Sequence, residues 1–293
     1  MKNYKLLISL TSLIGASFAA STPQVEQHDI AKFSDILNYV NQHQTKQDPD
    51  QLCLIYDMDN TILSAEPNVG GDSWMAWNSK LSTDNPNKIT NWNLSDDLHG
   101  FEGALRFFIK YYPTESDTLA IINQIKDTQQ HPSIVMTARS YERYFAATEN
   151  QLNTNKMNFK TNPIGVSGSK NQPLTLIPNN DFTAYKAYFN GVYYSADDNK
   201  GYEILYLLAQ QRKLSRNSNL CKTTIFVDNS ATNTQNVYQA FLNNKQGVNL
   251  IALHYTAYDN YLTPNAKTLA TWSVAESSSQ GQNLFNLIQQ LNP

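Results

Sequence analysis

The chain has 293 residues, of which 22 are basic and 25 acidic, and its formal net charge is −3. This near balance argues against a general nucleic-acid-binding protein, which would present a strongly basic face. The length is enough to bury a sizeable core, and it fits one domain with insertions or one and a half domains.

The first 20 residues have the layout of a secretory signal peptide. Two lysines precede an apolar stretch from Leu6 to Ile14. Small residues, Ser17 and Ala19, occupy the two positions that signal peptidase recognises before its cleavage site. This stretch is too short to span a bilayer comfortably, which takes about 20 residues. We therefore expect a periplasmic or secreted protein of residues 21–293, with no stable membrane association once the signal peptide is removed.

Downstream, short apolar runs alternate with segments that carry apolar residues at helical spacing. Such runs, bounded by polar residues, predict buried strands, and the helical spacing predicts amphipathic helices. The predicted strands cover residues 52–56, 134–136, 191–195, 224–227 and 248–253. The predicted helices cover residues 28–43, 116–128, 140–152, 201–213, 233–242 and 282–291, after a tail at 20–27. This alternation indicates an α/β fold with a Rossmann-like parallel sheet of about five strands flanked by helices.

Two stretches do not fit the alternation. Residues 64–113 are rich in Asn, Asp, Gly and Trp, and residues 153–190 are rich in Asn, Pro and Lys. Because a long structureless loop inside a compact domain is uncommon, we interpret both as inserted caps over one end of the sheet. The first holds Trp74, Trp77 and Trp92, for which packing in the core of the cap is a better interpretation than lining the mouth of a site.

Cys53 and Cys221 are the only cysteines. Both precede apolar runs that we interpret as neighbouring strands, and export would place them in an oxidising compartment where a disulfide can form. The alternative is a pair of buried thiols that act as small apolar residues. The sequence leaves both interpretations open and slightly favours the two thiols.

Polar residues of catalytic type stand where the predicted elements begin or end. Asp57 and Asp59 directly follow the run LCLIY, Thr137 follows another strand, Lys200 precedes a helix and Asp228 follows a further strand. Open α/β sheets bind ligands at the carboxyl ends of their strands. Each residue alone has an ordinary explanation, such as a helix cap, a surface lysine or a polar loop. The complete set in this order predicts a reactive site that combines acids, a hydroxyl and a cation.

This ordered set resembles the motifs of the haloacid dehalogenase (HAD) superfamily, over about residues 52–255. The string YDMDNTILSAEP is similar to the start of periplasmic class B acid phosphatases. The string NGVYYSADDNKGYEIL is similar to a group of secreted bacterial HAD-like proteins of unassigned function. The resemblance implies a Mg²⁺-dependent phosphomonoester hydrolase that acts through an aspartyl-phosphate intermediate on a HAD core.

The resemblance also implies a role for each residue. Asp57 would attack phosphorus, since a carboxylate is a workable covalent carrier of a phosphoryl group. Asp59 would protonate the leaving alkoxide and later deprotonate water. Asp228 would hold Mg²⁺ together with the Asp57 carboxylate and the backbone carbonyl of Asp59. Thr137 would hydrogen-bond a phosphoryl oxygen, and Lys200 would pair with both the nucleophile and the phosphoryl charge, so both would act in catalysis. The residues that would bind the substrate are Thr61, Thr137, Ala138 and Lys200.

Charge argues for the metal independently of the resemblance. Asp57, Asp228 and a phosphate dianion would crowd one site, and each like-charge contact near 4 Å costs about 1–4 kcal/mol. Lys200 supplies a single positive charge, whereas a hard divalent cation such as Mg²⁺ accepts oxygen ligands and offsets more. Many relatives carry a second acid directly after the metal aspartate, and this chain has Asn229 there. Asn229 can hold a metal-bound water or orient Lys200 without adding charge, so metal affinity is expected to be weaker.

Asn233 is a second candidate for a contact beyond the metal ligands, although a polar residue at a helix start explains it more simply. For Asn229, a contact beyond the metal ligands and a polar residue at a helix start are equally good explanations. The expected substrate is a small-molecule or peptide phosphomonoester, and no nucleic-acid partner is expected. Two other functions stay open: transfer of the phosphoryl group to another alcohol, and a secreted module for binding or host interaction with little turnover.

Overall fold

The computed structural model describes residues 22–44, 47–65, 70–82, 84–85, 106–168, 186–244, 246–259 and 263–277. The predicted signal peptide, the predicted helix 282–291 and most of the first predicted cap lie outside these residues. Within them, no helix is both long enough and apolar enough to cross a bilayer.

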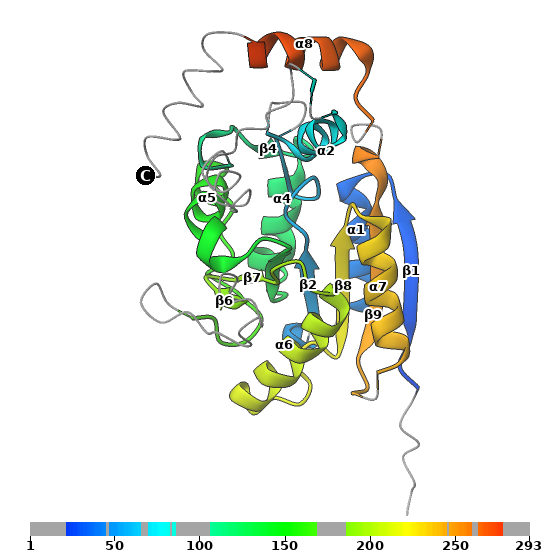
Figure 1. The fold of residues 1–293 in the computed structure, drawn as a ribbon. Helices are drawn as coiled ribbons and strands as arrows, with labels where there is room; N and C mark the ends of the chain where they lie inside the picture. The colour runs from blue at the N-terminus through cyan, green and yellow to red at the C-terminus, as the bar shows by residue number, and fades with distance from the viewer. Residues whose placement is uncertain are drawn as a thin grey trace, which may run out of the picture.

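A seven-stranded sheet forms the centre of the molecule, in the order β1-β9-β8-β2-β5-β7-β6 (Figure 1). Each strand runs parallel to its neighbour except β6, which pairs antiparallel with β7 at one edge. The strands are β1 (Val25–Ile30), β2 (Leu52–Tyr56), β5 (Ser133–Thr137), β6 (Ala187–Phe189), β7 (Val192–Tyr194), β8 (Thr223–Asp228) and β9 (Asn249–Tyr255). The α/β fold with a mostly parallel sheet is therefore confirmed, with more strands than the five expected.

Helices cover both faces of this sheet. Apolar residues of α1, α4 and α5 pack with one set of strand residues, and those of α6 and α7 pack with the opposite set. The central strands β2 and β5 are buried throughout because both of their faces are covered, which explains their continuous apolar sequences. The helices on the two faces are α1 (Ile36–His43), α4 (Thr118–Asn123), α5 (Tyr141–Thr154), α6 (Lys200–Ser215) and α7 (Ala231–Leu242).

The first strand corrects the sequence prediction. Residues 28–30, predicted as the start of a helix, belong to β1, which pairs with β9 from Val25↔Leu250 to Ile30↔Tyr255. The helix that follows starts only at Ile36, after a 3-10 turn, η1 (Phe33–Asp35). The reason is that β1 is an edge strand with the polar sequence VEQHDI, so it lacks the apolar run by which buried strands are detected.

The ends of the first predicted cap come together. β3 (Leu63–Ser64) and β4 (Tyr112–Pro113) form a two-stranded antiparallel sheet. Between them lies α2 (Asp72–Lys80), and Figure 1 shows it beside α8 (Ala266–Ser277), beyond the ends to which β2 and β8 point. Trp77 of α2 contacts Trp272 of α8, with 5.6 Å between ring centroids. Trp74 is completely buried, as core packing predicts, and Trp92 lies outside the described residues.

The described part of the second predicted cap adds to the sheet and its cover. Residues 187–189 form the edge strand β6, and Phe159 and Ile164 are buried among the core residues. Residues 169–185 lie outside the described part of the chain. The first end of this segment therefore packs with the core residues that cover the sheet, and the second end completes the sheet, because β6 pairs with β7.

Cys53 and Cys221 form a disulfide, with their Cα atoms 5.0 Å apart. Cys53 lies in β2 and Cys221 lies just before β8, and these two strands are paired neighbours. The slight preference of the sequence for two free thiols was therefore wrong. The pairing of β2 with β8 explains the disulfide, because it brings two residues that are 168 positions apart within bonding distance.

Candidate active site

Parallel pairing of β2 with β8 brings two carboxylates side by side. The register aligns Tyr56 with Val227, and the Asp57 amide donates to the Val227 carbonyl at 2.8 Å. Asp57 and Asp228 are therefore adjacent at the carboxyl ends of neighbouring strands, and both are buried. The sequence predicted this meeting of residues from distant parts of the chain.

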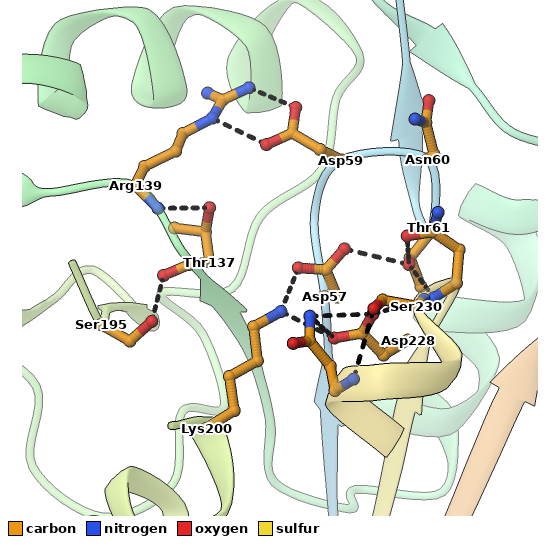
Figure 2. Close-up of polar contacts among 12 residues, drawn as sticks. Asp57, Asp59, Asn60, Thr61, Thr137, Arg139, Ser195, Lys200, Asp228 and Ser230 are labelled. Atoms are coloured by element: carbon orange, nitrogen blue, oxygen red, sulfur yellow. Dashed lines mark hydrogen bonds and ion pairs between the residues drawn. The ribbon is translucent and has the colours of Figure 1, made fainter. Parts of the chain in front are cut away.

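Lys200 connects the two carboxylates. Its Nζ lies 2.5 Å from Oδ1 of Asp57 and 2.7 Å from Oδ2 of Asp228 (Figure 2). Burial lowers the pKa of Lys200, but the two carboxylates raise it more, so the ammonium is held in its charged form. Lys200 is the first residue of α6, and the Asn199 side chain caps this helix by accepting from the Gly201 amide at 3.0 Å. We call Asp57, Lys200 and Asp228 the lysine site.

Thr61 links the loops that follow β2 and β8. Its hydroxyl lies 3.1 Å from Oδ2 of Asp57 and 3.2 Å from Oδ1 of Asn229, and it accepts from the Asn229 amide at 2.9 Å. A hydroxyl carries one proton, so it donates to only one of the two oxygens at a time. Asn60, which precedes it, has a φ of 61°, a conformation that Asn tolerates better than most residues. Thr61 therefore orients the Asp57 carboxylate, and its expected role in substrate binding stays a prediction.

The start of α7 holds Asp228 in place. The Ser230 amide donates to Oδ1 of Asp228 at 2.8 Å, and the Asn233 side-chain amide lies 3.1 Å from Oδ2. Ser230 also caps α7 by accepting from the Asn233 backbone amide at 3.3 Å. Asn233 is thus a helix-start residue, as the simpler explanation held, and it also contacts the acid expected to bind the metal.

Thr137 is the last residue of β5, which pairs with β2 on the side opposite to β8, and Ala138 follows it. The Thr137 hydroxyl accepts from the Arg139 amide at 3.3 Å, and its carbonyl accepts from the amide and hydroxyl of Ser195, each at 2.9 Å. The Ala138 carbonyl accepts from the Asp197 amide at 2.8 Å. These bonds tie the loop after β5 to the loop that leads into α6 and Lys200 (Figure 2).

Asp59 is bound by two buried arginines. Arg139 donates from Nε and a terminal nitrogen to the two Asp59 oxygens at 2.9 and 2.7 Å, and Arg106 donates to one of them at 2.8 Å. Arg106 also pairs with Asp72 of α2 at 2.8 Å. Burial alone would raise the pKa of Asp59, but the two guanidinium charges hold this pKa well below its usual range. We call Asp59, Asp72, Arg106 and Arg139 the arginine cluster.

The arginine cluster bears on the acid–base role expected of Asp59. A carboxylate that is ion-paired on both oxygens is a poor proton donor. Proton transfer by Asp59 therefore requires that its side chain turn away from Arg139 and Arg106. The sequence interpretation missed both arginines. Arg139 had a signal, because it stands two residues after Thr137 at a strand end, whereas Arg106 lies inside the first predicted cap and had none.

The donor set of the lysine site fits Mg²⁺. Burial raises the pKa of Asp57 to about 7, with Asp228 and Asp59 adding to the increase and Lys200 opposing it. Two carboxylates with one ammonium are thus short of positive charge, and carboxylate oxygens are preferred ligands of Mg²⁺. Within the described ranges, no group of three or more His, Cys, Asp or Glu side chains is arranged to hold a metal ion, so water and backbone oxygens would complete the coordination.

Comparison with known proteins adds a family. Residues 29–288 match the family described as "Protein of unknown function (DUF2608)". The chain belongs to this family. The match spans the whole sheet beyond the start of β1, together with the lysine site and the arginine cluster. Searches among curated proteins and among solved structures find no match.

Proposed function

We propose that this DUF2608 member is an exported, Mg²⁺-dependent phosphomonoester hydrolase of the HAD type, with Asp57 as the nucleophile. The observation that carries the proposal is Lys200, which lies between two strand-end carboxylates that come from distant parts of the chain. Buried charges are costly, and clusters of them in a strand-end position are typical of functional sites.

The contacts of Asp57 suit a nucleophile. Thr61 lies near one carboxylate oxygen and Lys200 binds the other, so the carboxylate is held in one orientation before substrate arrives. Such positioning supplies much of the rate enhancement in phosphoryl transfer. One Asp57 oxygen forms a bond to phosphorus as the bond from phosphorus to the leaving oxygen breaks, and water then cleaves the aspartyl phosphate. The Lys200 ammonium stabilises the charge on the transferring group in both steps.

Asp57 and Asp228, with the backbone carbonyl of Asp59, are the residues that would hold Mg²⁺, which would offset the phosphate charge. The chain prepares Asp228 for this task through the Ser230 amide and Asn233. Proton transfer belongs to Asp59 once its side chain has left Arg139 and Arg106. Arg106 comes from the first predicted cap. That part of the cap would therefore influence when the Asp59 side chain leaves the two arginines.

The disulfide supports export. Structural disulfides persist in oxidising compartments and are rare in the cytosol. Cys53 and Cys221 are paired in the core, and the chain starts with the pattern of a signal peptide. A periplasmic or secreted location accounts for both features.

Asp57→Asn tests the proposal, because it keeps the shape of the side chain and removes the nucleophile. The purified wild type should hydrolyse an aryl phosphate in the presence of Mg²⁺ and lose this activity with a chelator. Asp57→Asn should have no activity, and Asp117→Asn, which changes an exposed acid, should keep it. Full turnover by Asp57→Asn would refute the nucleophile assignment.

Two further outcomes separate the rival functions. Phosphorylated products formed from an added alcohol would indicate a phosphotransferase with the same nucleophile. Binding of Mg²⁺ without turnover of nucleotides, sugar phosphates or phosphopeptides would indicate a secreted binding module instead.

A further inference from the structure

A second cluster of buried charges surrounds Glu203 of α6, the helix that starts with Lys200. Glu203 and Lys186 are only 6% and 4% exposed, and the Lys186 Nζ lies 2.7 Å from Oε1 of Glu203. The Tyr193 hydroxyl donates to the other Glu203 oxygen, and the partly exposed Asp198 also pairs with Lys186. The mechanism proposed above uses no residue of this second cluster.

Glu203 stands three residues after Lys200 on the same helix, and both side chains are buried. Side chains three apart on a helix are neighbours, so a lysine and a glutamate at this spacing can form an ion pair, although the order with the glutamate first is the more favourable one. Lys200 therefore has two sets of possible carboxylate partners, the pair in the lysine site and Glu203. In the structure it contacts the pair, and Glu203 contacts Lys186.

We infer that Lys186 is a positioning residue: it neutralises Glu203, so that the Lys200 ammonium is committed to Asp57 and Asp228. The geometry supports this inference because Lys186 reaches α6 from outside the helix, directly before β6. A buried carboxylate that loses its counter-ion is strongly destabilised, and a new ion pair with another cation within reach would relieve that cost. Without Lys186, that cation is Lys200, and each ion pair it forms with Glu203 weakens its hold on the nucleophile.

The inference rests on the proposed function for its effect on turnover, but not for its structural content. Lys186→Met should lower kcat by about 10- to 100-fold, the scale associated with a misplaced catalytic group. Lys186→Met/Glu203→Gln should recover most of the lost kcat, because the competing charge is gone. Lys186→Arg should also retain activity. A simple loss of packing would not be repaired by a second substitution that removes a charge.

Lys126→Met is the matched control. Lys126 is another buried lysine with a carboxylate partner, Asp127, and it lies in η3 (Gln124–Thr128), which packs on the face of the sheet opposite to α6. Its loss should lower the Tm but leave kcat close to wild type. If Lys186→Met does not fold, Glu203→Gln provides the second test, and its kcat should stay within about threefold of wild type since nothing competes for Lys200.

Crystal structures of the wild type and Lys186→Met give a readout that needs no activity. The Nζ of Lys200 should move from Asp57 towards Glu203 in the variant. If the wild type proves inactive but the Nζ moves, the proposed function fails and the positioning role stands. The inference is overturned if Lys186→Met keeps wild-type kcat with its Nζ in place, or if Glu203→Gln loses activity as severely as Lys186→Met.

Discussion

The disulfide between Cys53 and Cys221 joins β2 and β8 near the ends opposite to the lysine site. It closes a loop of 168 residues, which spans more than half of the chain. A crosslink restricts the unfolded chain more as the loop grows, and for this loop the chain-entropy relation gives about 5 kcal/mol at 25 °C. The loss of this bond should therefore remove a large part of the stability of the fold.

Equilibrium unfolding in urea, with and without a thiol reductant, measures this contribution. Both cysteines are completely buried, so the reductant must act at urea concentrations where the protein unfolds and refolds. With a urea dependence of about 3 kcal/mol per M, a loss of about 5 kcal/mol lowers the unfolding midpoint by roughly 1.7 M. Circular dichroism and tryptophan fluorescence should report the same transition.

The variant Cys53→Ala/Cys221→Ala is the control. It should unfold at a low midpoint without reductant, and adding the reductant should not shift that midpoint further. Equal midpoints for the oxidised and reduced wild type would refute the reasoning, because they would show that the crosslink does not restrict the unfolded chain.

Two further perturbations address α6 and a buried histidine. Gly201→Ala would place a Cβ 2.6 Å from the Ala240 Cβ and 2.8 Å from the Asn236 carbonyl oxygen, so α6 must move away from α7. Such overpacking costs about 1–3 kcal/mol, so the Tm should fall. The kcat should also fall, because the movement of α6 displaces Lys200. An unchanged Tm would contradict the close approach of the two helices. Burial lowers the pKa of His131, although its bond to the Pro49 carbonyl opposes the shift. As the pH falls below about 6.5, the pKa of a histidine in the unfolded chain, the unfolded chain binds more protons than the folded chain. The contribution of the neutral, buried His131 to the free energy of unfolding is therefore fully present above that pKa and is lost as the pH falls below it. His131→Asn should flatten that part of the curve of unfolding free energy against pH, and an unaltered slope would exclude His131 as its source.

The sequence predicts the centre of the fold and misses its edges. β2 and β8 are strands covered on both faces, so they appear as apolar runs, and the acids that end them are visible as exceptions. β1 and β6 are edge strands, and their short or polar sequences do not differ from a loop or a helix start. β1 is only partly buried and therefore lacks an apolar run, whereas β6 is buried but has only three residues, too few to show a pattern.

The arginine cluster could be predicted only in part, for a different reason. Arg139 follows Thr137 closely, so its place at the strand end could be inferred from the chain. Arg106 comes from a segment whose path depends on tertiary contacts, such as its bonds to Asp59 and Asp72. The pairing of Cys53 with Cys221 has the same character, since it follows from which strands are neighbours and not from the spacing of the cysteines.

The two groups of charges divide the site into a neutral part and a negative part. The arginine cluster contains two guanidinium groups and two carboxylates, and their contacts pair them within the cluster. The lysine site contains two carboxylates and one ammonium. The unbalanced negative charge therefore lies at Asp57 and Asp228, where the parallel strands end. A divalent cation placed there would reverse the local charge, and only then could the site attract a phosphate dianion. Metal binding should accordingly precede substrate binding.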